Sequence, residues 1–507
     1  MTKHNVWTAV PITDLSREDM KSAIQDGMYI KYKHDATTGA YERSKARLHA
    51  GGHKQWEDHF SDNDTFTINT MVVFLVLKFM TALNWNHAVF DIKGAYLYAP
   101  RTHPKPQYMH LTAKLTQLWI ARHPEDAKYV HNGRLYVRLN KALYGLKDSR
   151  RAWYDHLSAF LVAKGFNISE SDPCLYIKYV DPTNFVYILT HVDDLLVTGL
   201  GECFHTFDQV LATQFPEFNQ QTNNIFNYLG MSIQRTPDQR TTTINQRPYI
   251  LILLDKFNMA DCTPVKSPCG PDLLQAREDA SGPCDKYLFV SIVMSLMFLA
   301  RISRPDILFP TTYMATKSAS PTNDNLLSVK RIICYLKGTV NYALTFSGTN
   351  VDLEVYADAS HGIYADGKGH HAAVFVVGND EVIRTCNRMK TVSLSSTESE
   401  LIAAVDAATY FRWIVKLFRE LRIDIETPVT LKQDNQSAIH MMTHGLNFKK
   451  TKHMTIKLEF VRALIKDGIM RPEYTPTNDM YADTYTKPYY GAKLVRYTAR
   501  VMTCLPK

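Results

Sequence analysis

The sequence predicts an α/β (α+β) protein of several domains, and three observations lead to that prediction. The chain has 507 residues, enough for two to four domains at roughly 100–200 residues each. Apolar residues make up 45% and charged residues 21% of the chain, which is typical of folded rather than disordered proteins. Runs rich in Ile, Val, Tyr and Phe alternate with segments of helical periodicity, as in α/β folds.

The first part of the chain, from about residue 25 to 235, combines strands with helices. Residues in these strands are β-branched or aromatic, and the helix has apolar positions on one face. The elements expected are strands at 86–98, 135–139 and 185–197 and a helix at 149–163.

The rest of the chain divides into a helical part and a further α/β part. Between about 245 and 345 the pattern is helical and is interrupted by prolines, with helices expected at 286–301 and 326–337. Another α/β pattern begins near Val351 and continues to about Pro488. The last residues, Tyr489 to Lys507, are basic and show only weak patterning.

Charge and cysteine content exclude several classes of protein. The 58 Lys and Arg against 50 Asp and Glu give a net charge of +8, a weak field that favours a polyanionic partner only mildly. The eight cysteines are scattered without a C-x-x-C pair, which favours reduced thiols over a disulfide framework or zinc site. The start has no apolar signal core, and the apolar stretches 71–77 and 287–300 are shorter than the ~18–20 residues of a membrane span. We therefore expect an intracellular protein, cytoplasmic or nuclear, without a membrane partner.

The most informative segment contains two adjacent acids. Apolar runs flank Asp193 and Asp194 in residues 185–198, which predicts a hairpin with both carboxylates at its tip. Adjacent like charges near buried strands are costly unless a cation compensates them. A polar turn needs no metal, however, so the pair alone is equally compatible with a structural turn.

A second acid in matching surroundings favours the functional interpretation. Asp91 ends another strand-like run, and if it lies beside Asp193 their carboxylates converge. Such a pair can hold two divalent ions, which stabilise the attacking and leaving oxygens of phosphoryl transfer. Mg²⁺ fits because it prefers oxygen ligands, and Mn²⁺ is a possible substitute.

Eight strings in this chain resemble, in order, those of the reverse transcriptases of copia-type LTR retrotransposons. Together they are very specific and cover nearly the whole chain. The strings are RSKARL (43–48), DIKGAY (91–96), KALYGLKDSRRAWY (141–154), DPCLY (172–176), HVDD (191–194), YLGM (228–231), SRPDI (303–307) and YLKGT (335–339).

The resemblance implies roles for the acids of the first constellation. Asp91 and Asp193 would be metal ligands, and Asp194 would be the adjacent acid of the Asp-Asp box. Many family members carry an aromatic residue where this chain has His191. A histidine there can still hydrogen-bond or stack near the primer end, so we expect tuning rather than loss.

The resemblance also implies substrate contacts. Tyr96 matches the aromatic residue that packs under the incoming sugar and disfavours a 2′-hydroxyl; alternatively it is a core tyrosine. Lys45 and Arg47 lie on a basic strand that could contact the triphosphate, or that could simply be solvated. Gly145 would let the backbone approach the template–nucleotide pair. Gly230, with Leu229, would form the turn that grips the primer end.

A second constellation of acids occupies the C-terminal region. Asp358 ends a strand, Glu400 lies early in a helix that opens at 395, Asp434 follows a strand, and Asp483 precedes a helix. That order is the plan of the ribonuclease H fold, and the strings are similar to the copia-type version. The four acids would hold two Mg²⁺ ions that activate water against an RNA phosphodiester. Four exposed acids on an ordinary α/β domain are the less favoured alternative.

Two details of this second constellation stay open. Glu398 is the alternative to Glu400, but it fits better as an N-terminal charge of the helix. A histidine found before the last acid in some ribonucleases H is not matched, and Asn478 lies near that place. Slower product release would be the expected consequence.

A basic cluster precedes the final strand. It consists of Lys449, Lys450, Lys452, His453 and Lys457. The cationic face could follow the phosphates of a hybrid or could be merely solvated. In the helix that follows and ends near Gly468, Ile456, Phe460 and Leu464 repeat at helical spacing, which predicts a buried face.

Taken together, we expect a right-hand polymerase followed by a ribonuclease H-like α/β domain. Fingers and palm would occupy 1–240, a helical thumb or connection 241–345, the ribonuclease H-like domain 346–490 and a tail 491–507. The expected partners are an RNA template, a DNA primer, the RNA–DNA hybrid and deoxynucleoside triphosphates, without a prediction of oligomeric state. Alternatives are a decayed or host-adopted remnant that binds nucleic acid without polymerising, and a ribonuclease H alone.

Overall fold

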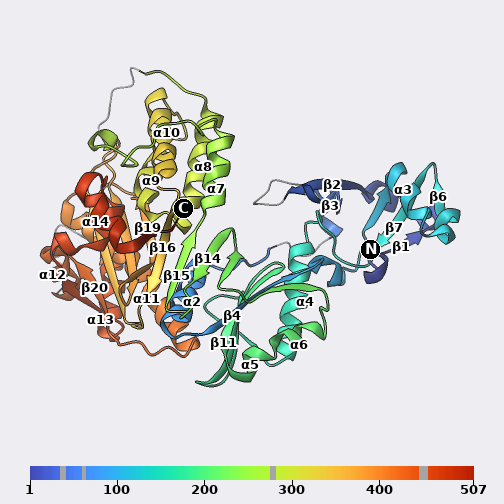
Figure 1. Ribbon diagram of the computed structural model, residues 1–507, viewed down its shortest axis with the longest axis horizontal. Helices are drawn as coiled ribbons and strands as arrows, with labels where there is room; N and C mark the ends of the chain where they lie inside the picture. Colours follow the sequence, from blue (N-terminus) through green and yellow to red (C-terminus); the bar gives the residue numbers. More distant parts are fainter. Residues whose placement is uncertain (35–40, 60–63, 275–280, 445–454, 507) are drawn as a thin grey trace. The chain divides into compact units, whose positions relative to one another are not determined.

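The computed structural model describes residues 1–34, 41–59, 64–274, 281–444 and 455–506 (Figure 1). The chain forms two compact units: Met1–Ile68 with Phe90–Gln220, and Asn69–Val89 with Gln221–Lys507. Among the helices of the described part, none combines the length and the apolar character that a membrane crossing requires.

The first unit contains a six-stranded sheet near the N-terminus. Its order is β1-β7-β5-β2-β3, with β6 paired to β7. The core beneath it is built from alternate strand residues such as Met109, Leu135 and Val137. The elements are β1 (Trp7–Val10), α1 (Arg17–Ser22), β2 (Ile24–His34), β3 (Tyr41–Ala50), β5 (Tyr108–Leu111), α3 (Ala113–Ile120), β6 (Val130–His131) and β7 (Arg134–Leu139).

A second six-stranded sheet in this unit has the order β12-β4-β11-β10-β9-β8. The predicted hairpin is confirmed as the antiparallel pair β10–β11, and the predicted helix is confirmed as α4. Strands and helices here are β4 (Asn86–Ile92), α4 (Ser149–Ala163), β8 (Asn167–Ile168), β9 (Leu175–Asp181), β10 (Asn184–His191), β11 (Asp194–Leu200), α5 (Gly201–His205), α6 (Phe207–Ala212) and β12 (Phe218–Gln221).

Helix α2 (Thr70–Ala82) belongs to the second unit although it precedes β4 in the chain. It is apolar and buried from Val72 onward, and its Lys78 is completely buried. The Lys78 Nζ donates to the Ser347 carbonyl (2.6 Å) and ion-pairs with Asp380 (2.7 Å). Because removing one partner of a buried ion pair costs about 3–5 kcal/mol, this contact fastens α2 to the C-terminal half of the chain.

The middle of the second unit is a five-stranded antiparallel sheet with a helical layer (Figure 1). The helices predicted at 286–301 and 326–337 are confirmed as α8 and α10. The elements are β13 (Ile225–Tyr228), β14 (Met231–Arg235), β15 (Thr241–Asn245), α7 (Arg247–Lys256), α8 (Lys286–Ile302), α9 (Leu308–Ala315), α10 (Asn323–Gly338), β16 (Tyr342–Ser347) and β22 (Met502–Cys504).

Two of the family strings meet in a buried ionic cluster within this layer. The Arg304 guanidinium donates to both Asp306 oxygens (3.0 and 2.7 Å), and the Tyr335 hydroxyl donates to the same carboxylate (2.7 Å). Arg304 also donates to the Thr339 carbonyl (3.0 Å). The strings SRPDI and YLKGT therefore join the end of α8 to α10 and stabilise the packing of these two helices.

The last sheet of the second unit has the order β19-β18-β17-β20-β21. Strands β17, β18 and β19 pair antiparallel, whereas β20 pairs parallel with β17 and β21. Helix α11 packs on β17 and β18. The elements are β17 (Leu353–Ser360), β18 (His370–Val377), β19 (Asp380–Arg388), α11 (Ser396–Glu420), β20 (Val429–Gln433), α12 (Gln436–His444), α13 (Thr455–Lys466), β21 (Met470–Tyr474) and α14 (Gly491–Val501).

The buried face of α13 differs from the sequence-based expectation. In α13 the buried residues are Leu458, Val461 and Leu464, whereas Ile456 is 86% exposed and Phe460 is 37% exposed. The predicted face was therefore wrong at two of its three positions, because Leu458 and Val461 define the core stripe. Lys449, Lys450, Lys452 and His453 of the basic cluster lie outside the described residues.

The C-terminal segment, for which the sequence indicates no regular element, forms α14 and β22. Leu494, Tyr497, Thr498 and Val501 are its buried helix positions, and their spacing is that of one helix face. Strand β22 then pairs with β16. The compact units also group 69–89 and 221–240 with the C-terminal half, so the boundary placed at residue 240 stays a prediction.

Candidate active sites

The β10–β11 hairpin presents the adjacent acids at its turn. His191 pairs with Asp194 across the hairpin, which leaves Val192 and Asp193 as the turn residues. Val192 adopts a φ of 59°, a left-handed conformation that is unfavourable for a β-branched residue. The Trp153 indole on α4 donates to the Val192 carbonyl (2.5 Å). The tryptophan of the central string thereby holds the turn that carries Asp193.

Asp91 lies beside this turn on the neighbouring strand. Strands β4 and β11 are adjacent in the sheet, and the Ile92 N–H donates to the Asp193 carbonyl (2.9 Å). The Asn219 side-chain amide donates to the Asp91 carboxylate (3.2 Å). Asp91 and Asp193 line one cavity of about 590 Å³. Strand pairing thus brings the two predicted metal ligands to a common space.

A cation and an aromatic ring line the same cavity. Arg47 on β3 lies over the Tyr144 ring, with its guanidinium carbon 5.8 Å from the ring centroid. Burial, followed by the charge of Asp193, raises the pKa of Tyr144 to about 12, so its hydroxyl stays protonated. Tyr96 packs edge-on against Tyr144 at 4.8 Å between centroids and is buried. Tyr144, rather than Tyr96, faces the cavity.

Asp194 and His191 are half-buried on the strands that leave the turn. Desolvation, followed by the charges of Asp193 and Asp91, raises the pKa of Asp194 to about 6. Desolvation lowers the pKa of His191, which Asp193 partly opposes. His191 is therefore predominantly a neutral imidazole at pH 7, and its buried Nδ1 has no hydrogen-bond partner among the described residues.

Three other predicted residues have different surroundings. Lys45 lies on β3, and its side chain is outside the described part. Gly145 has a φ of 93°, and a Cβ there would meet the Ala50 carbonyl at 2.2 Å, so the glycine permits close approach to the end of β3. Gly230 and Leu229 form the two-residue turn between β13 and β14, with φ of 74° and 51°, in the second unit.

The second constellation brings three acids close together. Asp358 is buried in β17, Glu400 lies in the second turn of α11, and Asp434 follows β20. One carboxylate oxygen from each lies within 4.8 Å of the others. Glu398 instead accepts the Leu394 N–H (2.8 Å) at the start of α11.

Asp483 lies nearby but is held by other partners. Its carboxylate forms an ion pair with Lys487 and accepts the Tyr489 hydroxyl (2.8 Å). Lys487 Nζ also lies 3.9 Å from Asp358. Of the four predicted acids, the structure therefore groups three, and a lysine joins the fourth to them.

The electrostatics of this group fit a divalent cation. Desolvation raises the pKa of Glu400 and of Asp358, and for Glu400 the charges of Asp358 and Asp434 add to the shift. Glu400 Oε2 is buried and has no hydrogen-bond partner among the described residues. Buried like charges with an unused oxygen are stabilised by an oxygen-preferring ion such as Mg²⁺. Within the described chain, Asp91, Asp193 and Asp194 do not form such a tight group.

Sequence reasoning missed several residues of these sites. Asn219, Tyr144 and Trp153 contact the first site, and Lys487 contacts the second. Tyr144 and Trp153 belong to the string KALYGLKDSRRAWY, so the resemblance could have identified them as residues near the site. Asn219 carried no local signal, because its partner Asp91 is distant in sequence. Lys487 follows Asp483 by four residues, but nothing local pointed to its second partner, Asp358.

Comparison with known proteins identifies the class. Residues 5–271 match the family described as reverse transcriptase (RNA-dependent DNA polymerase), and this chain belongs to that family. It is 29% identical over 481 residues to a retrovirus-related Pol polyprotein from transposon RE1 of Arabidopsis thaliana, covering 93% of this chain and 31% of that protein. It is 26% identical over 462 residues to the corresponding polyprotein from transposon TNT 1-94 of Nicotiana tabacum, covering 88% and 33%. The resemblance to copia-type Pol polyproteins is thereby confirmed.

The fold is similar to that of a solved viral enzyme. A foamy viral protease-reverse transcriptase, solved in complex with double-stranded DNA, matches with a TM-score of 0.51 and 11% identity, covering 94% of this chain and 68% of that one. The predicted fold class is confirmed. This chain spans about a third of the length of the curated relatives it matches.

Proposed function

We propose that this chain is an RNA-directed DNA polymerase of a copia-type retrotransposon that also cleaves RNA in RNA–DNA hybrids. It extends a DNA primer on an RNA template with deoxynucleoside triphosphates. The observation that carries the polymerase proposal is the meeting of Asp91 and Asp193 on neighbouring strands at one cavity, together with Arg47 and Tyr144. Family membership and the fold support it.

The cavity residues have separable tasks in this proposal. Asp91 and Asp193 would hold Mg²⁺, with Mn²⁺ as a substitute. When bound, the ions supply charge stabilisation at the reacting phosphate oxygens. Arg47 neutralises triphosphate charge. Tyr144 offers a ring face to the nucleotide, and the buried Tyr96 supports that ring from behind.

The remaining predicted contacts stay part of the proposal. His191 would meet the primer end as a neutral imidazole, and Lys45 would add charge near the triphosphate. Gly230 would contribute the primer-gripping turn. Gly145 would act indirectly, because it lets the loop that carries Tyr144 lie against β3.

The proposed ribonuclease H site rests on Asp358, Glu400 and Asp434. These carboxylates would hold Mg²⁺. Asp483 would become a fourth ligand when its ion pair with Lys487 breaks. The parallel and antiparallel order of the β17–β21 sheet supports this assignment. The duplex would be bound through its backbone and shape, which suits copying without sequence preference.

Primer extension on an RNA template tests the polymerase proposal. Asp193→Asn should lower incorporation by about a hundredfold or more, because the charge that gathers the ions is reduced. Asp208→Asn, at a partly exposed acid on α6, is the matched control and should retain activity. Absence of metal-dependent incorporation by the unmodified chain would refute the polymerase proposal.

Cleavage of a labelled RNA–DNA hybrid tests the second site. Asp434→Asn should abolish cleavage and spare primer extension, whereas the exposed Asp424→Asn should leave both unchanged. Hybrid cleavage without primer extension would show that the chain acts as a ribonuclease and not as a polymerase. Binding of nucleic acid without either activity would favour the adopted remnant.

A further inference from the structure

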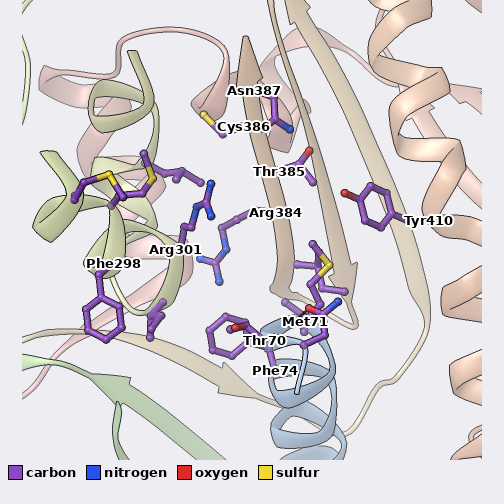
Figure 2. Close-up of a pocket in the computed structure, with 17 residues that line it drawn as sticks. Thr70, Met71, Phe74, Phe298, Arg301, Arg384, Thr385, Cys386, Asn387 and Tyr410 are labelled. Carbon is purple, nitrogen blue, oxygen red and sulfur yellow. Dashed lines mark hydrogen bonds between the residues drawn. The ribbon is translucent and has the colours of Figure 1, made fainter. Parts of the chain in front are cut away.

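A third site lies in the second unit, apart from both acid groups. A cavity of about 610 Å³ opens where the first turn of α2, the last turns of α8 and strand β19 meet (Figure 2). None of the residues assigned above to catalysis or substrate binding lines it. Its volume is that of an ordinary small-molecule pocket.

Two guanidinium groups extend into this cavity from different elements. Arg301 comes from α8 and Arg384 from β19, and Figure 2 shows both side chains reaching toward the same space. The terminal nitrogens Nη1 and Nη2 of Arg384 are buried and have no hydrogen-bond partner among the described residues. Its guanidinium lies 5.8 Å from the centroid of the Phe74 ring.

The lining contains no negative charge to offset the two arginines. No Asp or Glu is present among the lining residues. A buried donor without a partner costs free energy, and the cost is larger for a charged group. The buried guanidinium of Arg384, with Arg301 beside it and no acid in the lining, is therefore a site that an anion would complete.

A helix terminus adds to the positive potential. Thr70 and Met71, in the first turn of the 13-residue helix α2, line the cavity. The N-terminal end of a helix carries a partial positive charge that attracts anions. Asn69 already accepts the Met71, Val72 and Val73 N–H groups, so the helix contributes only its field. The two guanidinium groups are the donors that match a phosphate monoester, with a charge of about −1.5 to −2, better than a single carboxylate.

The rest of the lining is largely apolar and partly aromatic. Methionine side chains adapt to flat ligands, and aromatic rings stack on them. Thr385 and Asn387 on β19 add polar groups. The methionines and phenylalanines of this lining are Met71, Phe74, Met294, Met297 and Phe298.

We propose that this cavity binds a phosphate monoester carried on a planar ring, of which a nucleoside monophosphate is the simplest example. The phosphate lies between Arg301 and Arg384, whose planar forks can bind its oxygens in pairs. The planar ring of the ligand lies against the methionine and phenylalanine side chains of the lining. The site does not depend on the proposed polymerase or ribonuclease activity.

Calorimetric titration of the full chain with AMP tests the proposal. The buffer contains EDTA, so that metal-dependent nucleotide binding at the acid groups is suppressed. AMP should bind with a dissociation constant of about 10–100 μM, and inorganic phosphate and adenosine should each bind at least tenfold more weakly. Arg384→Gln and Arg301→Gln should each weaken AMP binding by about tenfold or more.

The matched control is Arg388→Gln on the same strand. Arg388 ion-pairs with Asp366 and does not line the cavity, so its substitution should leave AMP binding unchanged. Arg301 is exposed, and its variant keeps the test valid should Arg384→Gln fail to fold. The proposal is overturned if AMP does not bind up to about 10 mM, if the Arg301 variant binds normally, or if inorganic phosphate binds as tightly as AMP.

Discussion

The two acid groups differ in how the chain holds carboxylates near one another. In the first unit, Asp91 and Asp193 come from neighbouring strands of one sheet and face an open cavity. In the second, Asp358 and Glu400 are buried on a strand and a helix. Lys487 forms ion pairs with Asp358 and Asp483, whereas Asp91 accepts only a neutral amide from Asn219 among the contacts described above.

This difference indicates which perturbation each site resists. The first site depends on backbone geometry, because one turn places Asp193 and one indole supports that turn. The second site depends on charge balance, because its acids are desolvated and must either hold a proton or lie beside a cation. Geometry-changing substitutions should therefore damage the first site most, and charge-changing substitutions the second.

The largest expected effect concerns the turn of the first site. Trp153→Phe keeps an aromatic ring, although a smaller one, and removes the hydrogen bond to the Val192 carbonyl. Without this hydrogen bond the strained turn at Val192 can shift, and Asp193 shifts with it. Misplacement of a reacting group commonly costs about 10–100-fold in rate. We expect primer extension to fall by that amount while hybrid cleavage is unchanged.

Trp119→Phe is the control for this substitution. Trp119 lies on α3, and its indole also donates to one acceptor, Asp126 (2.8 Å). Neither residue lines the cavity. Extension should remain within about twofold of the unmodified chain. An equal loss in both variants, or an equal loss of cleavage, would contradict the geometric dependence of the first site.

The next effect concerns Asp194, whose pKa in the folded chain is about 6 instead of 3.8. Between these pH values the folded state binds more protons than the unfolded state, so stability falls as pH rises from about 4 to 6. Asp194→Asn removes that penalty. The full shift would correspond to about 3 kcal/mol. Because solvent screens a half-buried carboxylate, we expect about 2 kcal/mol of added stability at pH 8 and little change below pH 4, measured by denaturant unfolding. Stabilisation that is equal at both pH values would contradict the desolvation of Asp194.

Much of the fold follows from local pattern. Helix α4 and the β10–β11 hairpin were predictable, since apolar spacing and the polar interruption at Asp193 are local signals. The order of the C-terminal acids also predicted a shared site for Asp358, Glu400 and Asp434. The preference for Glu400 over Glu398 followed from helix position alone.

Other features depend on contacts that no local pattern contains. Lys78 interrupts an apolar run, and only the fold supplies Asp380, 302 residues away, as its partner. The buried face of α13 was mispredicted because the helix carries apolar residues on two neighbouring faces. One face includes Ile456 and Phe460 and the other includes Leu458 and Val461, and tertiary packing buries the second. Lys487 is in sequence a lysine before a proline, and its role becomes visible only beside Asp358.

A smaller effect is expected from removing this lysine. Lys487→Met leaves the buried acids without their cation, but its side chain is 42% exposed, and water screens part of the loss. We expect about 1 kcal/mol of destabilisation at pH 8 in EDTA, which Mg²⁺ should reverse, measured by thermal unfolding. Lys493→Met on the exposed side of α14 should have no such Mg²⁺-dependent effect. A loss that Mg²⁺ does not reverse would show that Lys487 is structural rather than a counter-charge.

The smallest effect distinguishes the sites by the protons that Mg²⁺ displaces. Asp434→Asn leaves the first site available, and Asp193→Asn leaves the second. At pH 7 Asp194 already retains only about a tenth of a proton, so the first site should release very little. Burial raises the pKa of Glu400 to about 9 and that of Asp358 to about 7. Ion binding requires their ionised forms, so the second site should release one proton or more. Calorimetry in buffers of different ionisation enthalpy measures this number, and equal release from the two variants would mean that the acid groups do not differ in charge balance.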